Sequence, residues 1–134
     1  MRSINVTMDS VYSTNIESAT EVNHMYRQIL YTDATSQLVL MSVNPGEDIH
    51  WEAHTGSQFF RIESGHGTLT TKNPKRIHAF TARKNLKPGL ALIVPANTWH
   101  YVKNTGKVPL KLYTIYSPPQ HDPMDNSERQ PTQE

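Results

Sequence analysis

Gly46 to Gly65, the stretch GEDIHWEAHTGSQFFRIESG, decides how the rest of the chain is interpreted. It places three side chains that carry lone pairs, Glu52, His54 and Gln58, within a short span, and His50 lies two residues before Glu52. Successive side chains of a β-strand point to opposite faces, so His50, Glu52 and His54 are predicted to share one face. Donors gathered on one face of one strand form half of a metal site, and the other half is expected from a distant strand.

A second stretch, Gly89 to Asn104, supplies the expected partner. It reads GLALIVPANTWHYVKN and contains His100 as a further nitrogen donor. The sequence therefore predicts one divalent ion bound by Glu52, His54, Gln58 and His100. Two imidazoles, one carboxylate and one amide oxygen form a mixed nitrogen and oxygen site, which suits Zn, Mn, Fe or Ni better than Ca or Mg.

Each of these residues also has a purely structural interpretation. His54 and His100 are alternatively buried histidines with satisfied hydrogen bonds, and Glu52 alternatively forms a salt bridge. Gln58 is nearly as well suited to a hydrogen bond with another ligand as to direct coordination.

Length and composition indicate an ordinary globular domain. The chain has 134 residues, enough for one domain with a buried core. Cys is absent, which excludes disulfides and thiolate ligands, and the net charge of +1 gives no field that attracts nucleic acid or a membrane. The longest apolar run, residues 38–43, is too short to span a bilayer, and the start of the chain has no apolar signal core. We expect a soluble, cytoplasmic protein whose partner is a small-molecule substrate, with no nucleic acid and no membrane.

Short strand patterns recur along the chain, separated by turn residues. The predicted strands are residues 25–32, 37–43, 49–54, 58–63, 68–71, 76–81, 91–94, 99–103 and 110–116. A helix over 19–30 is the alternative for the first of them, and 84–89 is predicted as a basic loop. Many short strands without a long helix indicate an all-β sandwich or barrel.

The chain is expected to have three parts. Residues 1–24 are predicted as an N-terminal arm or edge strand, because their apolar residues are single and scattered. Residues 25–117 form the barrel. Residues 118–134 are predicted as a flexible C-terminal tail, since they offer little apolar surface for packing.

The two stretches resemble the paired motifs of the cupin superfamily. The first motif of that family is Gly, five residues, His-x-His, three or four residues, Glu, six residues and Gly. The chain keeps this spacing between Gly46 and Gly65, with Glu52 in place of the first His and Gln58 in place of Glu.

The second motif of the family is Gly, five residues, Pro-x-Gly, two residues, His, three residues and Asn. The chain matches it with Gly89, Pro95, His100 and Asn104, and Asn97 replaces the second Gly. Asn tolerates a positive φ better than other residues that carry a side chain, so this exchange costs little.

The resemblance implies a fold and a choice of activities. The fold is a small antiparallel β-barrel, the double-stranded β-helix or cupin jelly roll. The chain looks like the small cupins labelled mannose-6-phosphate-isomerase-like, which implies a metal-dependent isomerase or lyase acting on a small polar, sugar-like substrate. Glu52, His54 and His100 alone resemble the donor set of non-haem Fe(II) oxygenases, so an Fe- or Ni-dependent dioxygenase is the alternative. A non-catalytic sugar- or metabolite-binding module is the third, because some cupins hold no metal.

Two further residues and one partner are predicted. His50, where the resembling group usually carries Gly, is the catalytic candidate, as a general base or acid or as a fifth ligand, if its ring reaches the interior. A solvent-facing His at a strand start is the alternative. Phe60 is expected to face inward as a wall of the substrate cavity. A homodimer is expected, because small barrels often cover their sheet edges by dimerising.

Overall fold

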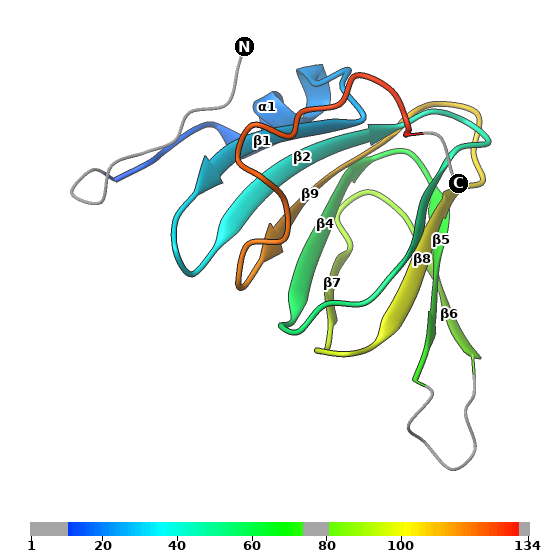
Figure 1. Ribbon diagram of the computed structural model, residues 1–134. Coiled ribbons are helices and arrows are strands. Elements are labelled where there is room, and N and C mark those ends of the chain that lie inside the picture. Colours follow the sequence, from blue (N-terminus) through cyan, green and yellow to red (C-terminus); the bar gives the residue numbers. More distant parts are fainter. Residues whose placement is uncertain (1–10, 74–80, 132–134) are drawn as a thin grey trace.

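Two antiparallel sheets face each other in the computed structural model, which describes residues 11–73 and 81–131 (Figure 1). One sheet has the strand order β1-β2-β9-β4-β7, and the other has the order β3-β8-β5-β6. The elements are α1 (Ile16–Val22), β1 (Arg27–Thr32), β2 (Gln37–Val43), β3 (Asp48–Glu52), β4 (Gln58–Ser64), β5 (Gly67–Lys72), β6 (Thr81–Leu86), β7 (Ala91–Val94), β8 (Trp99–Asn104) and β9 (Leu110–Tyr116). The predicted all-β antiparallel architecture is confirmed.

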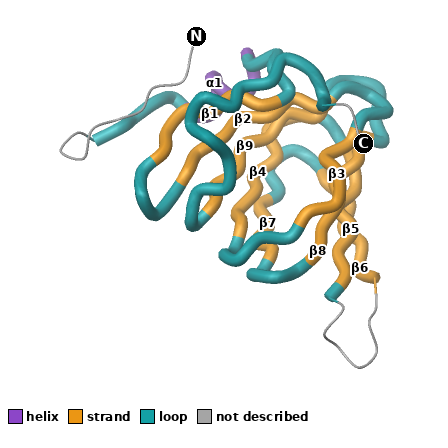
Figure 2. Tube along the Cα trace, in the orientation of Figure 1, coloured by secondary structure: helices purple, strands orange, loops and turns teal. Residues whose placement is uncertain are grey.

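The core lies between the two sheets, because alternate side chains of each strand point inward. On β2, Val39 and Met41 are almost fully buried and belong to the core, and on β4 the same holds for Phe60 and Ile62. Leu40 points to the other face of β2 and is buried as well. Helix α1 packs on that outer face of the five-stranded sheet, which explains why β2 is buried on both faces along most of its length (Figure 2).

A β-bulge in β3 changes the face to which its side chains point. Ile49 pairs with Val102 and Glu52 pairs with His100, so two residues of β3 lie opposite one residue of β8. The extra residue reverses the alternation. As a result, Ile49 and Glu52 both point between the sheets, while His50 is exposed. The prediction that His50 shares the face of Glu52 is therefore wrong.

Two turns carry backbone conformations that suit their residues. Gly65 has φ +88°, and a Cβ built there would lie 2.5 Å from the carbonyl oxygen of Pro109. Asn97 has φ 61°, the left-handed conformation in which it replaces the Gly of the second motif. The backbone N–H of Asn97 donates to the carbonyl oxygen of His54 at 2.7 Å. This hydrogen bond joins the loop before β8 to the loop that carries His54.

The segment 117–131, called the C-terminal strap below, runs back along β1. Arg27 and Ser127 form an antiparallel bridge, and the side chain of Asn126 accepts from the backbone N–H of Ile29 at 2.7 Å. Gln37, which is fully buried, donates to the carbonyl oxygen of His121 at 2.8 Å and accepts from its N–H at 3.1 Å. The expectation of a flexible tail thus differs from the structure over these residues, because hydrogen bonds hold the strap where apolar packing is scarce.

Some element boundaries also differ from the predictions. Strand β6 occupies Thr81–Leu86, which includes part of the predicted loop 84–89, and most of the predicted strand 76–81 lies outside the described residues. In the predicted arm, α1 is capped at its start by Asn15, whose side chain accepts from the N–H of Ser18. Residues 1–10 of that arm are not described. Among the described residues, no helix is long and apolar enough to cross a membrane.

Candidate metal centre

Glu52, His54 and His100 converge at one end of the barrel. Glu52 closes β3, His54 follows in the loop before β4, and His100 lies near the start of β8. One potential ligand atom from each residue lies within 4.8 Å of the others. His54 Nε2 lies 2.9 Å from Glu52 Oε1, and His100 Nε2 lies 3.8 Å from the same oxygen. The structure thus brings together three of the four predicted donors.

His100 presents a lone pair to this group. Its Nδ1 lies 3.0 Å from the carbonyl oxygen of Thr98, so Nδ1 carries the proton and donates. The Nε2 atom then has a free lone pair, and within the described part of the chain it is buried without a hydrogen-bond partner. Burial lowers the pKa of His100, so the neutral, ligating form is favoured.

His54 is oriented in the same way by the strap. Its Nδ1 lies 3.1 Å from Oε1 of Gln120, and the amide nitrogen of Gln120 donates to the carbonyl oxygen of Pro118 at 3.0 Å. That second hydrogen bond decides which end of the amide faces His54. Because Nδ1 of His54 donates to Gln120, its Nε2 is left to face Glu52.

Three acceptors therefore meet without a donor between them. Two Nε2 lone pairs and one carboxylate repel each other unless a cation lies among them, and a proton or a metal ion can fill that role. Burial by itself would raise the pKa of Glu52. Positive charge beside the carboxylate, such as a proton on His54 Nε2 that then donates to Oε1, together with the charge of His100, lowers that pKa below its ordinary value. A carboxylate that stays charged and two neutral imidazoles form a donor set suited to a divalent transition metal.

Gln58 offers a fourth donor. It is the first residue of β4 and its side chain is 2 % exposed. Its amide nitrogen donates to Oγ1 of Thr114 at 2.9 Å, which fixes the amide and leaves Oε1 free. In the described part of the chain, Oε1 is buried without a hydrogen-bond partner. A buried amide oxygen and a buried imidazole nitrogen, neither with a hydrogen-bond partner among the described residues, are suitable ligands for a cation.

The other two predicted site residues lie differently. His50 is exposed, so its side chain does not enter the barrel as the general-base prediction requires. Phe60 faces inward as expected, is 2 % exposed and packs its edge against the His100 ring at 6.0 Å between centroids. A cavity of about 390 Å³ lies nearby between β7 and the β5–β6 hairpin, and Phe60 is not among its lining residues.

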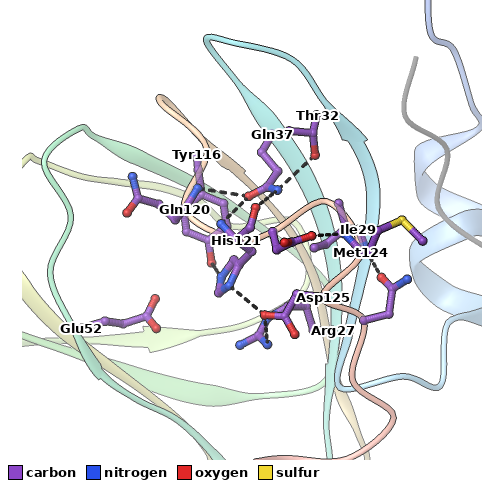
Figure 3. A network of polar contacts seen from close by, with 12 residues as sticks. Arg27, Ile29, Thr32, Gln37, Glu52, Tyr116, Gln120, His121, Met124 and Asp125 are labelled. Carbon is purple, nitrogen blue, oxygen red and sulfur yellow. Dashed lines mark hydrogen bonds and ion pairs between the residues drawn. The ribbon is translucent and has the colours of Figure 1, made fainter. Parts of the chain in front are cut away.

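The strap adds residues that sequence reasoning did not single out. The His121 ring lies edge-on to Tyr116 at 5.2 Å, and its Nε2 is 3.3 Å from the Tyr116 hydroxyl. Tyr116 in turn lies edge-on to His54 at 5.2 Å. Figure 3 shows Gln120 and His121 on the stretch of the strap that passes Glu52. The strap is rich in polar residues, which predicts a solvated tail. In its sequence, only His121 could have suggested a role in the site.

A second acidic group exists on the outer face of the barrel. One carboxylate oxygen each from Glu17, Glu21 and Glu63 lies within 4.8 Å of the others. Glu17 and Glu21 are exposed, and Glu63 already pairs with Arg61 at 3.3 Å. This cluster is largely exposed, and Arg61 already balances part of its negative charge, so it is a weaker metal site than the group formed by Glu52, His54 and His100.

Replacing Gln120 by Ala is expected to weaken binding of Zn²⁺ by about 10- to 100-fold, because His54 loses the acceptor that selects its tautomer. Competition with a chromophoric chelator measures the affinity. Gln130→Ala is the matched control: it removes another strap contact, the hydrogen bonds between Gln130 and Asp48, but leaves His54 untouched. Equal losses in both variants would show that Gln120 acts only by holding the strap.

The two-sheet barrel and the site near one of its ends are typical of one class of protein, and comparison with known proteins identifies that class. The family model described as "Cupin domain" matches residues 39–116, which include all four predicted ligands. The chain belongs to the cupin family.

Particular relatives extend the likeness beyond the barrel. "Uncharacterized protein YrkC" of Bacillus subtilis is 44 % identical over 111 residues, which cover 82 % of this chain and 59 % of YrkC. "Uncharacterized protein L612" of Acanthamoeba polyphaga mimivirus is 40 % identical over 92 % of this chain and 75 % of its own length. Among solved structures, BH2720 from Bacillus halodurans is 39 % identical with a TM-score of 0.80, covering 91 % of this chain and 92 % of that one. The chain spans less than two thirds of the length of YrkC.

Proposed function

We propose that the protein is a metal-dependent cupin enzyme, an isomerase or lyase that acts on a small polar, sugar-like substrate. The observation that carries this proposal is the convergence of one ligand atom each from Glu52, His54 and His100 within 4.8 Å, with Nε2 of His100 buried and without a hydrogen-bond partner among the described residues. The orphaned oxygen of Gln58 supports a fourth ligand from the chain. Zn, Mn, Fe or Ni fits such a mixed donor set at about 2.0–2.2 Å from each ligand atom.

The bound ion would act as a Lewis acid that polarises a carbonyl or hydroxyl oxygen of the substrate. The chain must then move a proton, and the exposed His50 is poorly placed for it. We propose His121 instead. Burial, together with the charge of Arg27, lowers the pKa of His121, so its ring stays neutral near pH 7 and can accept a proton. Its Nε2 faces the hydroxyl of Tyr116, and the charges of Glu52 and His54 both act on its ring.

A dioxygenase is the second candidate. Glu52, His54 and His100 without Gln58 make a two-His-one-carboxylate set, which leaves three positions for substrate and dioxygen. Direct coordination by Gln58 would leave fewer positions and favours the isomerase or lyase. The role of the Gln58 oxygen therefore separates the two candidates.

The test is turnover by protein loaded separately with Zn²⁺, Mn²⁺, Fe²⁺ and Ni²⁺. The proposal expects isomerisation or elimination of a sugar-derived carbonyl compound without oxygen uptake, and loss of turnover in Glu52→Ala. Oxygen consumption with Fe²⁺ or Ni²⁺ would favour the dioxygenase. Ligand binding without turnover, unchanged by metal removal, would leave a binding module.

We also propose that the protein is a homodimer, as the sheet edges suggest. Strand β7 is the edge of the five-stranded sheet, and its Ile93 is 68 % exposed. An exposed apolar edge strand is often covered by a second copy. Light scattering at micromolar concentration should give twice the mass of the chain, and a monomeric mass would refute the dimer.

A further inference from the structure

Arg27, the first residue of β1, carries a buried positive charge inside the barrel. It pairs with Met41, and Ile29 two residues further along β1 belongs to the core, so the side chain of Arg27 enters on the inner face. Only 12 % of this side chain is exposed. A buried guanidinium is costly unless anions or acceptors satisfy its N–H groups, so its partners indicate what the site is built to bind.

The partners of Arg27 are few and weak. Its Nε is buried without a hydrogen-bond partner among the described residues. Its NH1 lies 3.5 Å from Oδ2 of Asp125, beyond the ~2.7–2.9 Å of a charge-assisted hydrogen bond. The Tyr26 ring, 5.6 Å from the guanidinium carbon, adds a cation–π contact but no acceptor. The guanidinium therefore keeps unused capacity for a carboxylate.

Asp125 is a replaceable partner. It lies on the C-terminal strap, its side chain is 47 % exposed, and the same oxygen lies 3.7 Å from Nδ1 of His121. Figure 3 shows its carboxylate between Arg27 and His121, on the side of the strap where Glu52 also lies. One loosely held carboxylate thus occupies the place where another carboxylate would meet the Arg27 guanidinium and the His121 ring.

Arg27 and the proposed metal ligands face the same interior. A series of contacts joins them: Arg27 and His121 both approach Oδ2 of Asp125, the His121 ring lies 5.2 Å from that of Tyr116, and the Tyr116 ring lies 5.2 Å from that of His54. A small molecule that reaches from the donor cluster past Tyr116 and His121 would meet Arg27.

We propose that Arg27 is the specificity-determining residue of the site and that it recognises the carboxylate of a small substrate, which displaces Asp125 from the guanidinium. This inference rests on the proposed function, since it places the substrate carboxylate beside the same metal centre. A planar carboxylate matches the fork of a guanidinium with two parallel hydrogen bonds. A phosphate dianion fits less well, because a single Arg faces it while Glu52 and Asp125 repel the second charge.

Calorimetric titration with pyruvate, a 2-oxo acid, tests the proposal on protein with and without bound Zn²⁺. Arg27→Gln should weaken pyruvate binding by about 10- to 100-fold, the range for a lost hydrogen bond to a charged group. Arg27→Lys keeps the charge but not the fork, so an intermediate loss is expected. Asp125→Asn should tighten binding, because the internal competitor loses its charge.

Asp125→Asn separates recognition from a structural role. If Arg27 only anchors the strap, Asp125→Asn breaks the same anchor and weakens pyruvate binding as Arg27→Gln does, which would overturn the proposal. Unchanged binding in Arg27→Gln, or no binding of pyruvate to the wild type, would overturn it too. Neutral pyruvamide should bind more weakly than pyruvate, and tighter binding of inorganic phosphate would contradict the carboxylate assignment.

Metal content in the same samples keeps the two proposals apart. If the wild type holds no Zn²⁺, the proposed enzymatic function fails. Arg27-dependent binding of pyruvate to that metal-free protein would nevertheless support the anion site. If Zn²⁺ is bound but Arg27→Gln leaves pyruvate affinity unchanged, the anion site fails and the metal centre stands.

Discussion

Replacing Glu52 or His100 by Ala is expected to abolish stoichiometric binding of a transition metal. Each variant removes a ligand atom outright, so the loss of affinity should exceed the roughly 10- to 100-fold typical of residues that only orient a ligand. Glu52→Ala also removes the negative charge that makes a divalent cation favourable between two imidazoles. Elemental analysis of purified protein, together with chelator competition, measures the loss.

His50→Ala is the control for these variants. His50 lies on the same strand as Glu52, but it is exposed and lies within the bulge. Its replacement should leave metal content unchanged. If His50→Ala released the metal as completely as Glu52→Ala, the placement of these two side chains on β3 would be contradicted.

Replacing Phe60 by Ala is expected to lower the free energy of unfolding by about 3–5 kcal/mol, the range for a large aromatic residue removed from a core. Phe60 is 2 % exposed in the middle of β4 and packs against His100. The vacated space would also let the His100 ring tilt, so metal affinity should fall along with stability. Urea unfolding followed by fluorescence or circular dichroism measures the change.

Phe59→Ala is the matched control, because the neighbouring residue points to the opposite face. Phe59 is only partly buried and contacts the ring of Tyr113 at 6.2 Å. Its loss should cost about 1 kcal/mol, as for other partly exposed positions, and should leave the metal bound. Similar losses of stability in both variants would mean that Phe60 does not occupy the core position described above.

The fold was predictable because the sequence pattern repeats the sheet geometry. The apolar run of β2 indicated a strand buried on both faces, and α1 and the core cover those faces. The motif spacing predicted that Glu52, His54 and His100 come together, and the structure brings their potential ligand atoms within 4.8 Å although they lie on separate elements. The spacing of a motif predicts the positions of its residues well here, because only short loops connect β3 to β4 and β7 to β8.

His50 was placed on the wrong face because a bulge depends on the partner strand. Period-two alternation from Glu52 predicts His50 inside, and nothing in the sequence of β3 alone reveals the extra residue opposite β8. The pairing of Glu52 with His100 becomes visible only once both strands are aligned.

The strap was missed for a different reason. Its few apolar residues predict a solvated tail. In the structure, the buried side chain of Gln37 binds the backbone of the strap, and the side chain of Asn126 on the strap binds the backbone of β1. Hydrogen bonds between a strap and a sheet have no periodic signature in the sequence. Gln120, His121 and Arg27 therefore entered the site only through the tertiary structure.

The most direct test of the metal centre is a crystal structure of the protein grown with Zn²⁺, with anomalous diffraction recorded on both sides of the zinc absorption edge. We expect one strong anomalous peak at about 2.0–2.2 Å from Nε2 of His54, Nε2 of His100 and the Glu52 carboxylate. The position of the Gln58 oxygen relative to that peak would show whether it is a fourth ligand. A peak only at the exposed carboxylates Glu17 and Glu21, or none in protein that remains folded, would contradict the account.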